Sequence, residues 1–139
     1  MQRNTKNEFI GSWSNTNNQR KNIDLTKFNG AIITGPKTNL VVLDVDVKKD
    51  QQSDKTDGMT EWATHIEQHG EVNTFKVLTP SGGFHYYFKY DNANERVKYL
   101  MENYLPNKSG YRNSGLDITT KGGVIMMLGS LFDCTTYEI

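Results

Sequence analysis

The sequence has little of several features that mark particular classes of protein. Its 139 residues contain one cysteine, Cys134, which excludes an internal disulfide framework and a zinc knuckle or ribbon. A lone thiol also fits a reducing compartment. No apolar run approaches the roughly 18 residues of a membrane-spanning helix, and we read no secretory signal at the start. We therefore expect a soluble, intracellular protein with one domain of ordinary size.

An excess of charge is absent too. Sixteen basic and sixteen acidic residues give a formal charge of zero, whereas domains that bind nucleic acid often carry a clear positive excess. Any basic groove must therefore be local, and we expect weak non-specific affinity for nucleic acid. With 35% hydrophobic and 23% charged residues, the composition is that of a polar globular domain rather than a disordered chain.

The spacing of apolar residues predicts an α+β fold in a single domain, with a mixed β-sheet and flanking helices. Residues 1–27 are rich in polar side chains, so we expect an irregular N-terminal segment that packs on the core, with one short docked element over 9–13. The folded domain then spans residues 28–139. Helices are predicted over 59–66 and 97–104, and strands over 31–34, 40–47, 74–78, 84–90, 116–119 and 124–128.

Two aspartates stand in the most apolar of the expected strands. Asp44 and Asp46 are two positions apart, so their side chains point to the same face with roots ~6.5–7 Å apart. Two like charges on one face repel each other unless a cation lies between them, and hard divalent cations prefer carboxylate oxygens. The alternative is the polar face of an edge strand, but the run 40–43 is typical of a strand buried on both faces. We therefore predict a two-carboxylate metal site.

A glycine-rich turn joins two further expected strands, which we predict to form a hairpin. Ser81, Gly82 and Gly83 lie in this turn, where glycines let backbone N–H groups approach an anion and the serine adds a hydroxyl donor. His85 follows and shares its strand face with Tyr87. A histidine beside such a turn can donate to a phosphate oxygen, but a plain hairpin accounts for the same residues, so both interpretations stay open.

A third aspartate, Asp117, also stands in an apolar strand. It completes a metal cluster if its strand lies beside that of Asp44, which the sequence alone leaves open. The following glycine turn carries Lys121, which either meets a phosphate or is a solvated turn residue. His65 and His69 lie four positions apart on the first helix without the acid placement of a zinc protease, so we interpret them as structural.

The order of these motifs resembles the bifunctional primase-polymerase domain of the archaeo-eukaryotic primase superfamily. That superfamily has a strand with two acids, then a small-x-His motif, then a strand with a third acid. Here the motifs correspond to Asp44 with Asp46, to residues 83–85, and to Asp117. The resemblance covers residues 28–139, and the ordered set is more specific than any single motif.

The resemblance implies a DNA primase and polymerase with an RNA-recognition-like sheet, which uses two Mg²⁺ or Mn²⁺ ions to join nucleotides on a single-stranded DNA template. Its implied partners are nucleoside triphosphates, the template, and a helicase domain in the same longer natural chain, of which this domain is a fragment. Viruses, plasmids and other mobile elements typically encode such proteins, which act where the host cytoplasm or nucleus supports replication. The implied metal ligands are Asp44, Asp46 and Asp117, and these three with His85 are the implied catalytic residues. The implied nucleotide-binding residues are Ser81, Gly82, Gly83, His85, Lys121 and Arg112.

Two other classes of function stay open. One is a catalytically weak module that binds nucleotides or single-stranded DNA, although such a surface has no use for three carboxylates that face phosphates. The other is a metal-dependent nuclease or replication initiator with a related sheet. That class needs a nucleophilic tyrosine or a histidine pair at the metal, and the expected strands offer no such pair.

Overall fold

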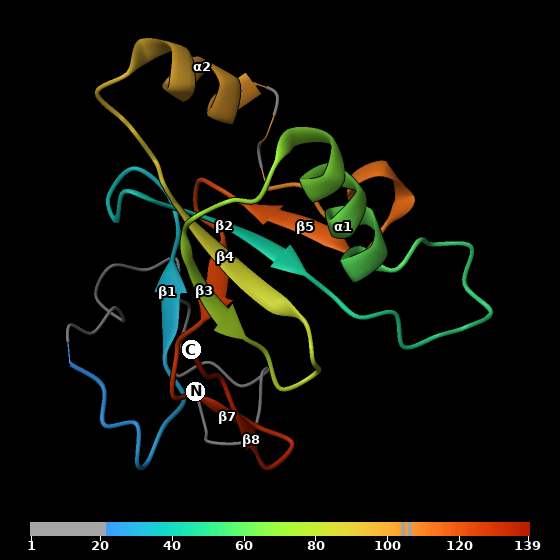
Figure 1. Ribbon diagram of the computed structural model, residues 1–139. Coiled ribbons are helices and arrows are strands. Elements are labelled where there is room, and N and C mark those ends of the chain that lie inside the picture. Colours follow the sequence, from blue (N-terminus) through green and yellow to red (C-terminus); the bar gives the residue numbers. More distant parts are fainter. Residues whose placement is uncertain (1–21, 104, 106) are drawn as a thin grey trace.

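The computed structural model describes residues 22–103, 105 and 107–139 (Figure 1). It confirms the α+β class, while the element predicted over 9–13 and most of the predicted N-terminal segment lie outside the described residues. The helical elements are α1 (Gly58–His69), α2 (Glu95–Asn103) and the short 3-10 turn η2 (Tyr111–Asn113). The strands are β1 (Ala31–Ile33), β2 (Leu40–Val45), β3 (Phe75–Leu78), β4 (Phe84–Lys89), β5 (Leu116–Thr119), β6 (Val124–Met126), β7 (Leu131–Phe132) and β8 (Thr135–Thr136).

The main sheet has four strands in the order β3-β4-β2-β5, all paired antiparallel. Along the chain these strands alternate with the helices as β2-α1-β3-β4-α2-β5, so each helix joins two strands that have a third strand between them. This is the interleaved split βαβ arrangement. It agrees with the expected RNA-recognition-like core and places β2, the strand that carries Asp44, inside the sheet between β4 and β5. A parallel bridge joins Thr56 to Ser114 outside the named strands.

Alternation along β2 divides its side chains between the two faces of the sheet. Leu43 and Val45 face α1, where they are buried with Leu116 and pack against Met59 and Trp62. The predicted helical spacing thus puts one apolar face of α1 on the sheet, as expected of an amphipathic helix. The strand ends at Val45 rather than at the predicted residue 47.

The opposite face of the sheet is covered by the C-terminal third of the chain. Val77 of β3 is buried there with Met126 and Tyr137, and Tyr87 of β4 packs against this cluster. A two-stranded ladder of β1 with β6 and the hairpin of β7 with β8 lie on this side (Figure 1). Backbone hydrogen bonds in both directions between Leu78 and Glu138 attach the C-terminal residues to the edge of β3. The central strand is therefore covered on both faces.

The second helix forms as its apolar spacing predicts, but it does not pack on the sheet. None of the residues of α2 is buried, and Tyr99 and Leu100 are 57% and 42% exposed. Figure 1 shows the helix standing beyond one end of the sheet. Neither this helix nor any other among the described residues is long and apolar enough to cross a bilayer.

The first helix begins at a charged cap. The carboxylate of Asp57 accepts hydrogen bonds from the N–H of Lys48 at 2.6 Å and of Thr60 at 3.1 Å. These donors, the N–H of Lys48 most of all, hold the pKa of Asp57 below its usual value. One side chain therefore caps the helix and ties down the start of the loop that precedes it.

Replacing this cap has an expected pH signature. Asp57→Ala should lower the free energy of unfolding by about 1 kcal/mol at neutral pH, because the N–H donors lose their acceptor. A pKa lowered by folding contributes stability above the unfolded value of about 3.9, and this contribution is lost as the pH falls through the folded value. Urea unfolding should therefore show the gap between wild type and variant closing below about pH 4. Asp54→Ala, an exposed change in the same loop, should show no such gap; a gap independent of pH would contradict the role of the charge.

Candidate functional site

Three of the predicted site residues form one row across the sheet. In the strand register Asp44 lies directly opposite His85 of β4 on one side and Asp117 of β5 on the other. Directly opposed residues of antiparallel strands share a face, with Cβ atoms ~4.5–5.5 Å apart. Asp46 follows two positions after Asp44 and is exposed. The strand order, which the sequence left open, thus brings the two acidic strands side by side.

In the pair at the centre of the row, His85 is buried, whereas the side chain of Asp44 is 22% exposed. The Nε2 of His85 lies 3.5 Å from the Oδ1 of Asp44, and His85 is 3% exposed. Among the described residues, neither this Oδ1 nor the Nδ1 of His85 has a hydrogen-bond partner. Buried polar atoms without partners are rare because each one costs desolvation energy. The Oδ1 of Asp44, whose contact with His85 is long for a hydrogen bond, can therefore still accept a hydrogen bond or coordinate a cation.

Two tyrosines enclose the histidine, and both are sensitive to the charge of the nearby carboxylates. The ring centroids of Tyr87 and Tyr137 lie 6.4 and 5.4 Å from that of His85. Burial, with a further contribution from Asp44, raises the pKa of Tyr87 to about 12. Burial also raises the pKa of Tyr137, and the charges of Asp44 and Asp46 add to this effect. Both phenols stay neutral at physiological pH, and the described ion pairs bring no lysine or arginine to Asp44. The carboxylates of Asp44 and Asp46, whose charges help to raise these pKa values, are the groups at this site that would attract a cation.

The third acid lies in the row, but its carboxylate is bound elsewhere. The hydroxyl of Ser109 donates to Asp117, with Oγ 2.9 and 3.0 Å from the two carboxylate oxygens, and the N–H of Gly110 donates to Oδ1 at 2.7 Å. These donors occupy part of the carboxylate's capacity of about four hydrogen bonds. Within residues 22–103, 105 and 107–139, no three His, Cys, Asp or Glu side chains converge to hold a metal ion. The predicted three-acid cluster therefore stays a prediction, with Asp117 positioned in register beside Asp44.

Three glycines enclose the backbone between the two aspartates. A Cβ on Gly83 would lie 2.1 Å from the carbonyl oxygen of Val45, and one on Gly58 or Gly115 would lie 2.5 or 2.8 Å from that of Asp46. Real Cβ atoms do not approach so closely, so only glycine allows these three segments to meet here. Hydrogen bonds from Asp46 N to Gly115 O and from Gly58 N to Asp46 O complete the enclosure. Sequence reasoning missed this role, although each glycine adjoins a motif.

The glycine turn uses its own backbone donors. The N–H of Gly82 donates to the carbonyl of Thr79 at 2.9 Å, and the N–H of Gly83 donates to the hydroxyl of Thr79 at 3.1 Å. Gly82 has a φ of 85°, a left-handed value that suits glycine at this position. Because both N–H groups already donate within the turn, the structure does not offer them to an anion, and the predicted anion contact of these glycines stays a prediction. Ser81 alone of the turn lines a pocket, which it shares with Asp46.

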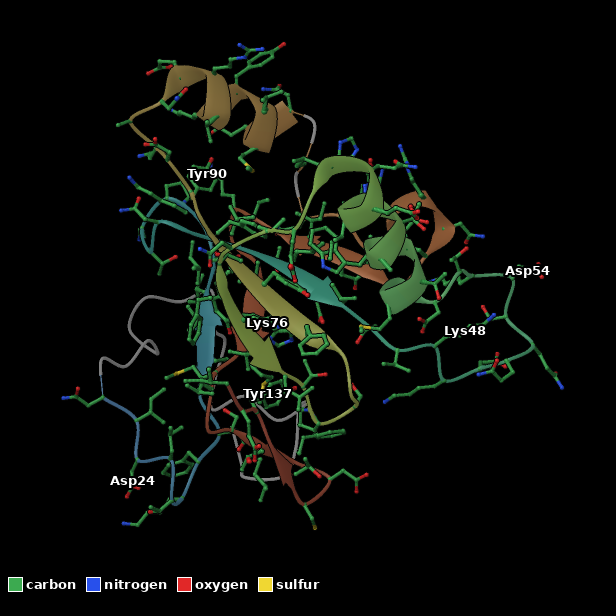
Figure 2. All side chains as sticks on the ribbon, viewed as in Figure 1. Asp24, Lys48, Asp54, Lys76, Tyr90 and Tyr137 are labelled. Atoms are coloured by element: carbon green, nitrogen blue, oxygen red, sulfur yellow. The ribbon has the colours of Figure 1, made fainter. Side chains whose placement is uncertain are left out.

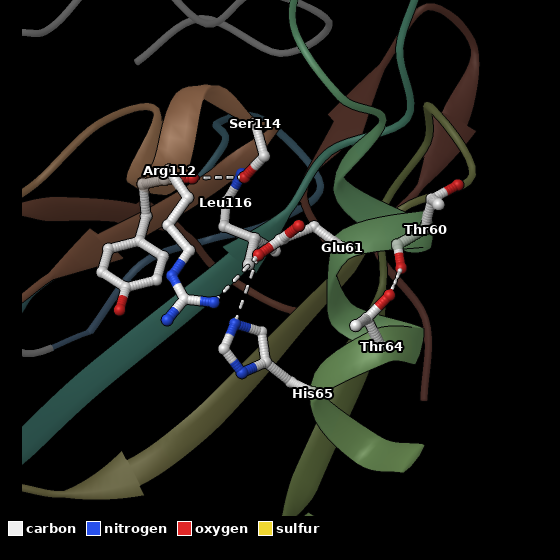
Figure 3. A network of polar contacts seen from close by, with 8 residues as sticks. Thr60, Glu61, Thr64, His65, Arg112, Ser114 and Leu116 are labelled. Carbon is white, nitrogen blue, oxygen red and sulfur yellow. Dashed lines mark hydrogen bonds and ion pairs between the residues drawn. The ribbon is translucent and has the colours of Figure 1, made fainter. Parts of the chain in front are cut away.

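The two basic candidates lie away from the row. Lys121 is in the turn between β5 and β6, with its ammonium 3.9 Å from Glu102. Arg112 lies beside α1, where its guanidinium is 3.9 Å from Glu61, which also pairs with His65 (Figure 3). The structure therefore brings neither base to Asp44, and Arg112 belongs to a network on the helix side of the sheet.

The fold and the site together define an α+β domain with one carboxylate on its inner strand β2, a second just after the end of that strand, and a histidine beside the first. Carboxylate pairs are the donors with which phosphoryl-transfer enzymes hold divalent ions. The family model of the bifunctional DNA primase/polymerase N-terminal domain matches residues 1–139, the whole chain. The chain therefore belongs to the Prim-Pol family, as the order of its motifs predicts, and the family is that of DNA primase/polymerase domains in replication. No curated protein and no solved structure shows a significant match.

Proposed function

We propose that this domain makes primers in DNA replication by metal-dependent, template-directed nucleotidyl transfer. The proposal is carried by the row of Asp44, His85 and Asp117 on three adjacent strands of a chain that matches the family along its whole length. In the proposed reaction the 3′-hydroxyl of a primer, or of a first nucleotide, attacks the α-phosphate of a nucleoside triphosphate. A new P–O bond forms while the hydroxyl proton passes to solvent, the bond from the α-phosphorus to the oxygen that bridges to the β-phosphate breaks, and pyrophosphate leaves.

The donors at the centre of the row fit the divalent cations that the family implies. The Oδ1 of Asp44 is buried without a hydrogen-bond partner, and Asp46 supplies a second carboxylate two positions on. Hard cations such as Mg²⁺ and Mn²⁺ take such oxygens. Asp117 joins them once its carboxylate turns from Ser109 and Gly110. When bound, the metal ions supply charge neutralisation at the attacking and leaving oxygens.

In this arrangement His85 positions another residue and does not itself contact the nucleotide. Its Nε2 faces Asp44, and Tyr137 covers its ring, so we assign it to orienting the carboxylate of Asp44. The direct phosphate contact that the resemblance implies requires Tyr137 to uncover the histidine. Ser81, on the rim beside Asp46, is the turn residue placed to donate to a nucleotide phosphate.

The orientation of Asp117 favours one alternative, a module that binds nucleotides or single-stranded DNA with weak catalysis. The proposed polymerase and this binding module are distinguished by incubating the chain with labelled nucleotides, Mn²⁺ and a single-stranded template, with and without a primer. The proposal expects metal-dependent extension products. Nucleotide binding without products would support the module, and degradation of the template without synthesis would support a nuclease; either result overturns the proposal.

A further inference from the structure

A pocket adjoins Asp46, and most of the residues that line it lie outside the family motifs. Its volume is about 410 Å³, and it lies between the loop that joins β2 to α1 and the glycine turn of the β3-β4 hairpin. Figure 1 shows this loop projecting from the end of β2, and Figure 2 shows Lys48 and Asp54 along it. Asp46 and Ser81 line the pocket, so it opens directly onto the candidate site.

Positive charge gathers in this pocket although the chain as a whole is neutral. Three lysines, Lys48, Lys49 and Lys55, line it within eight positions of the sequence, against two acids, Asp46 and Asp50. If a divalent cation neutralises Asp46, as the proposed function requires, the remaining charge of the pocket is strongly positive. Such a concentration in a concave surface raises the local concentration of anions.

The three lysines differ in whether the ammonium group is already bound by another part of the protein. The ammonium of Lys48 donates to the carbonyl of Ser53 at 2.7 Å, which closes the loop on itself. Lys49 and Lys55 are exposed, and among the described ion pairs neither has an acidic partner. A Cβ added at Gly110 would lie 3.7 Å from the Nζ of Lys55, so this lysine reaches toward the segment that binds Asp117. Two exposed lysines of the pocket are thus available to an anion, and one of them, Lys55, lies near the segment that binds the third acid.

From this placement we infer that the pocket binds the β- and γ-phosphates of the incoming nucleoside triphosphate, an inference that rests on the proposed function. The pocket is a local, open hollow next to Asp46, and its size suits a short polyanion, whereas an extended nucleic-acid strand needs a continuous groove. The hydroxyl of Ser81 on the facing wall adds a neutral donor, and lysines act as point charges toward phosphate. The α-phosphate then lies toward Asp46, where the reaction takes place.

The test measures binding of inorganic tripolyphosphate by calorimetry in EDTA, so that no metal ion contributes. The variant Lys49→Gln/Lys55→Gln removes two charges from the pocket and spares Lys48, which supports the loop. The matched control Lys37→Gln/Lys89→Gln makes the same change at exposed positions near the other end of β2. We expect the pocket variant to weaken tripolyphosphate and dATP binding by about tenfold, and the control to leave both within about twofold.

Binding of a single-stranded oligonucleotide, dT12, shows whether the pocket binds the phosphates of a nucleoside triphosphate or those of a nucleic-acid backbone. Its affinity should change equally little in the two variants. A loss of dT12 binding in the pocket variant without a loss of tripolyphosphate binding would assign the pocket to the strand backbone and overturn the inference. Equal losses of tripolyphosphate binding in the two variants, or none in either, would overturn it as well.

Failure of the proposed function gives a different result. In one outcome the wild type makes no extension products while the pocket variant alone loses tripolyphosphate binding. That result would support the pocket assignment and overturn the proposed polymerase function. If the wild type extends primers and the pocket variant keeps its KM for dNTPs, the polymerase stands and the pocket assignment falls.

Discussion

Asp44→Asn should reduce primer extension by at least about 10³-fold while leaving the fold intact. Asparagine keeps the shape of aspartate on the central strand and still offers an oxygen to His85, but it removes the charge that is placed to hold the cation. Because Asp44 is the one residue that faces both His85 and Asp117 in the register, no neighbour can replace it. The measurement is the rate of labelled-nucleotide incorporation at saturating Mn²⁺.

The matched control for this variant is Asp54→Asn. It makes the same chemical change at an exposed position in the loop after β2, so it should extend primers within about twofold of wild type. Circular dichroism and urea unfolding should show that both variants remain folded. An Asp44→Asn variant that keeps a tenth or more of the wild-type rate would remove this residue from the reaction.

Gly83→Ala should have the largest effect on stability, about 3 kcal/mol. The new Cβ would lie 2.1 Å from the carbonyl oxygen of Val45, which is backbone at the end of the inner strand β2 and is held there by pairing on both sides. The strands β2 and β4 must then separate at the position where Val45 faces Phe84. Urea unfolding gives the free energy, and the midpoint should fall with little change in slope.

The neighbouring variant Gly82→Ala separates crowding from backbone strain. Gly82 has a φ of 85°, but a Cβ there would find only Val47 Cγ2, at 3.9 Å. Its cost is the left-handed conformation alone, about 1–2 kcal/mol. If Gly83→Ala costs no more than Gly82→Ala, the close approach of the two strands is not what requires glycine at position 83.

The parts of the fold that the sequence predicts are those set by local spacing. Strand alternation puts Val45 on the face toward α1 and Asp44 on the opposite face, and helical spacing puts Met59 and Trp62 on the covered face of α1. The predicted shared face of Asp44 and Asp46 stays a prediction, because β2 ends at Val45. The order of the strands could not be predicted, because many pairings of short apolar strands bury the same side chains. Only the register shows that Asp44 lies between His85 and Asp117.

What the sequence could not show depends on contacts between distant segments. The burial of His85 under Tyr137 joins residues more than fifty positions apart, and neither position carries a local signal for it. The hydrogen bonds of Asp117 to Ser109 and Gly110 likewise form only after the segment before η2 folds beside β5. The exposed apolar face of α2 shows the converse, since its spacing predicts a helix but not a packing partner.

The central claim is that the carboxylates of Asp44 and Asp46 form a divalent-cation site, and titration with Mn²⁺ tests it most directly. Calorimetry, or the loss of free Mn²⁺ signal in electron paramagnetic resonance, should give saturable binding to the wild type. Asp44→Asn/Asp46→Asn should weaken that binding by more than about 100-fold, because both ligands are lost. Asp50→Asn/Asp54→Asn, the same charge change in the adjoining loop, should leave it nearly unchanged. Equal Mn²⁺ affinity in the wild type and in the Asp44→Asn/Asp46→Asn variant would contradict the claim.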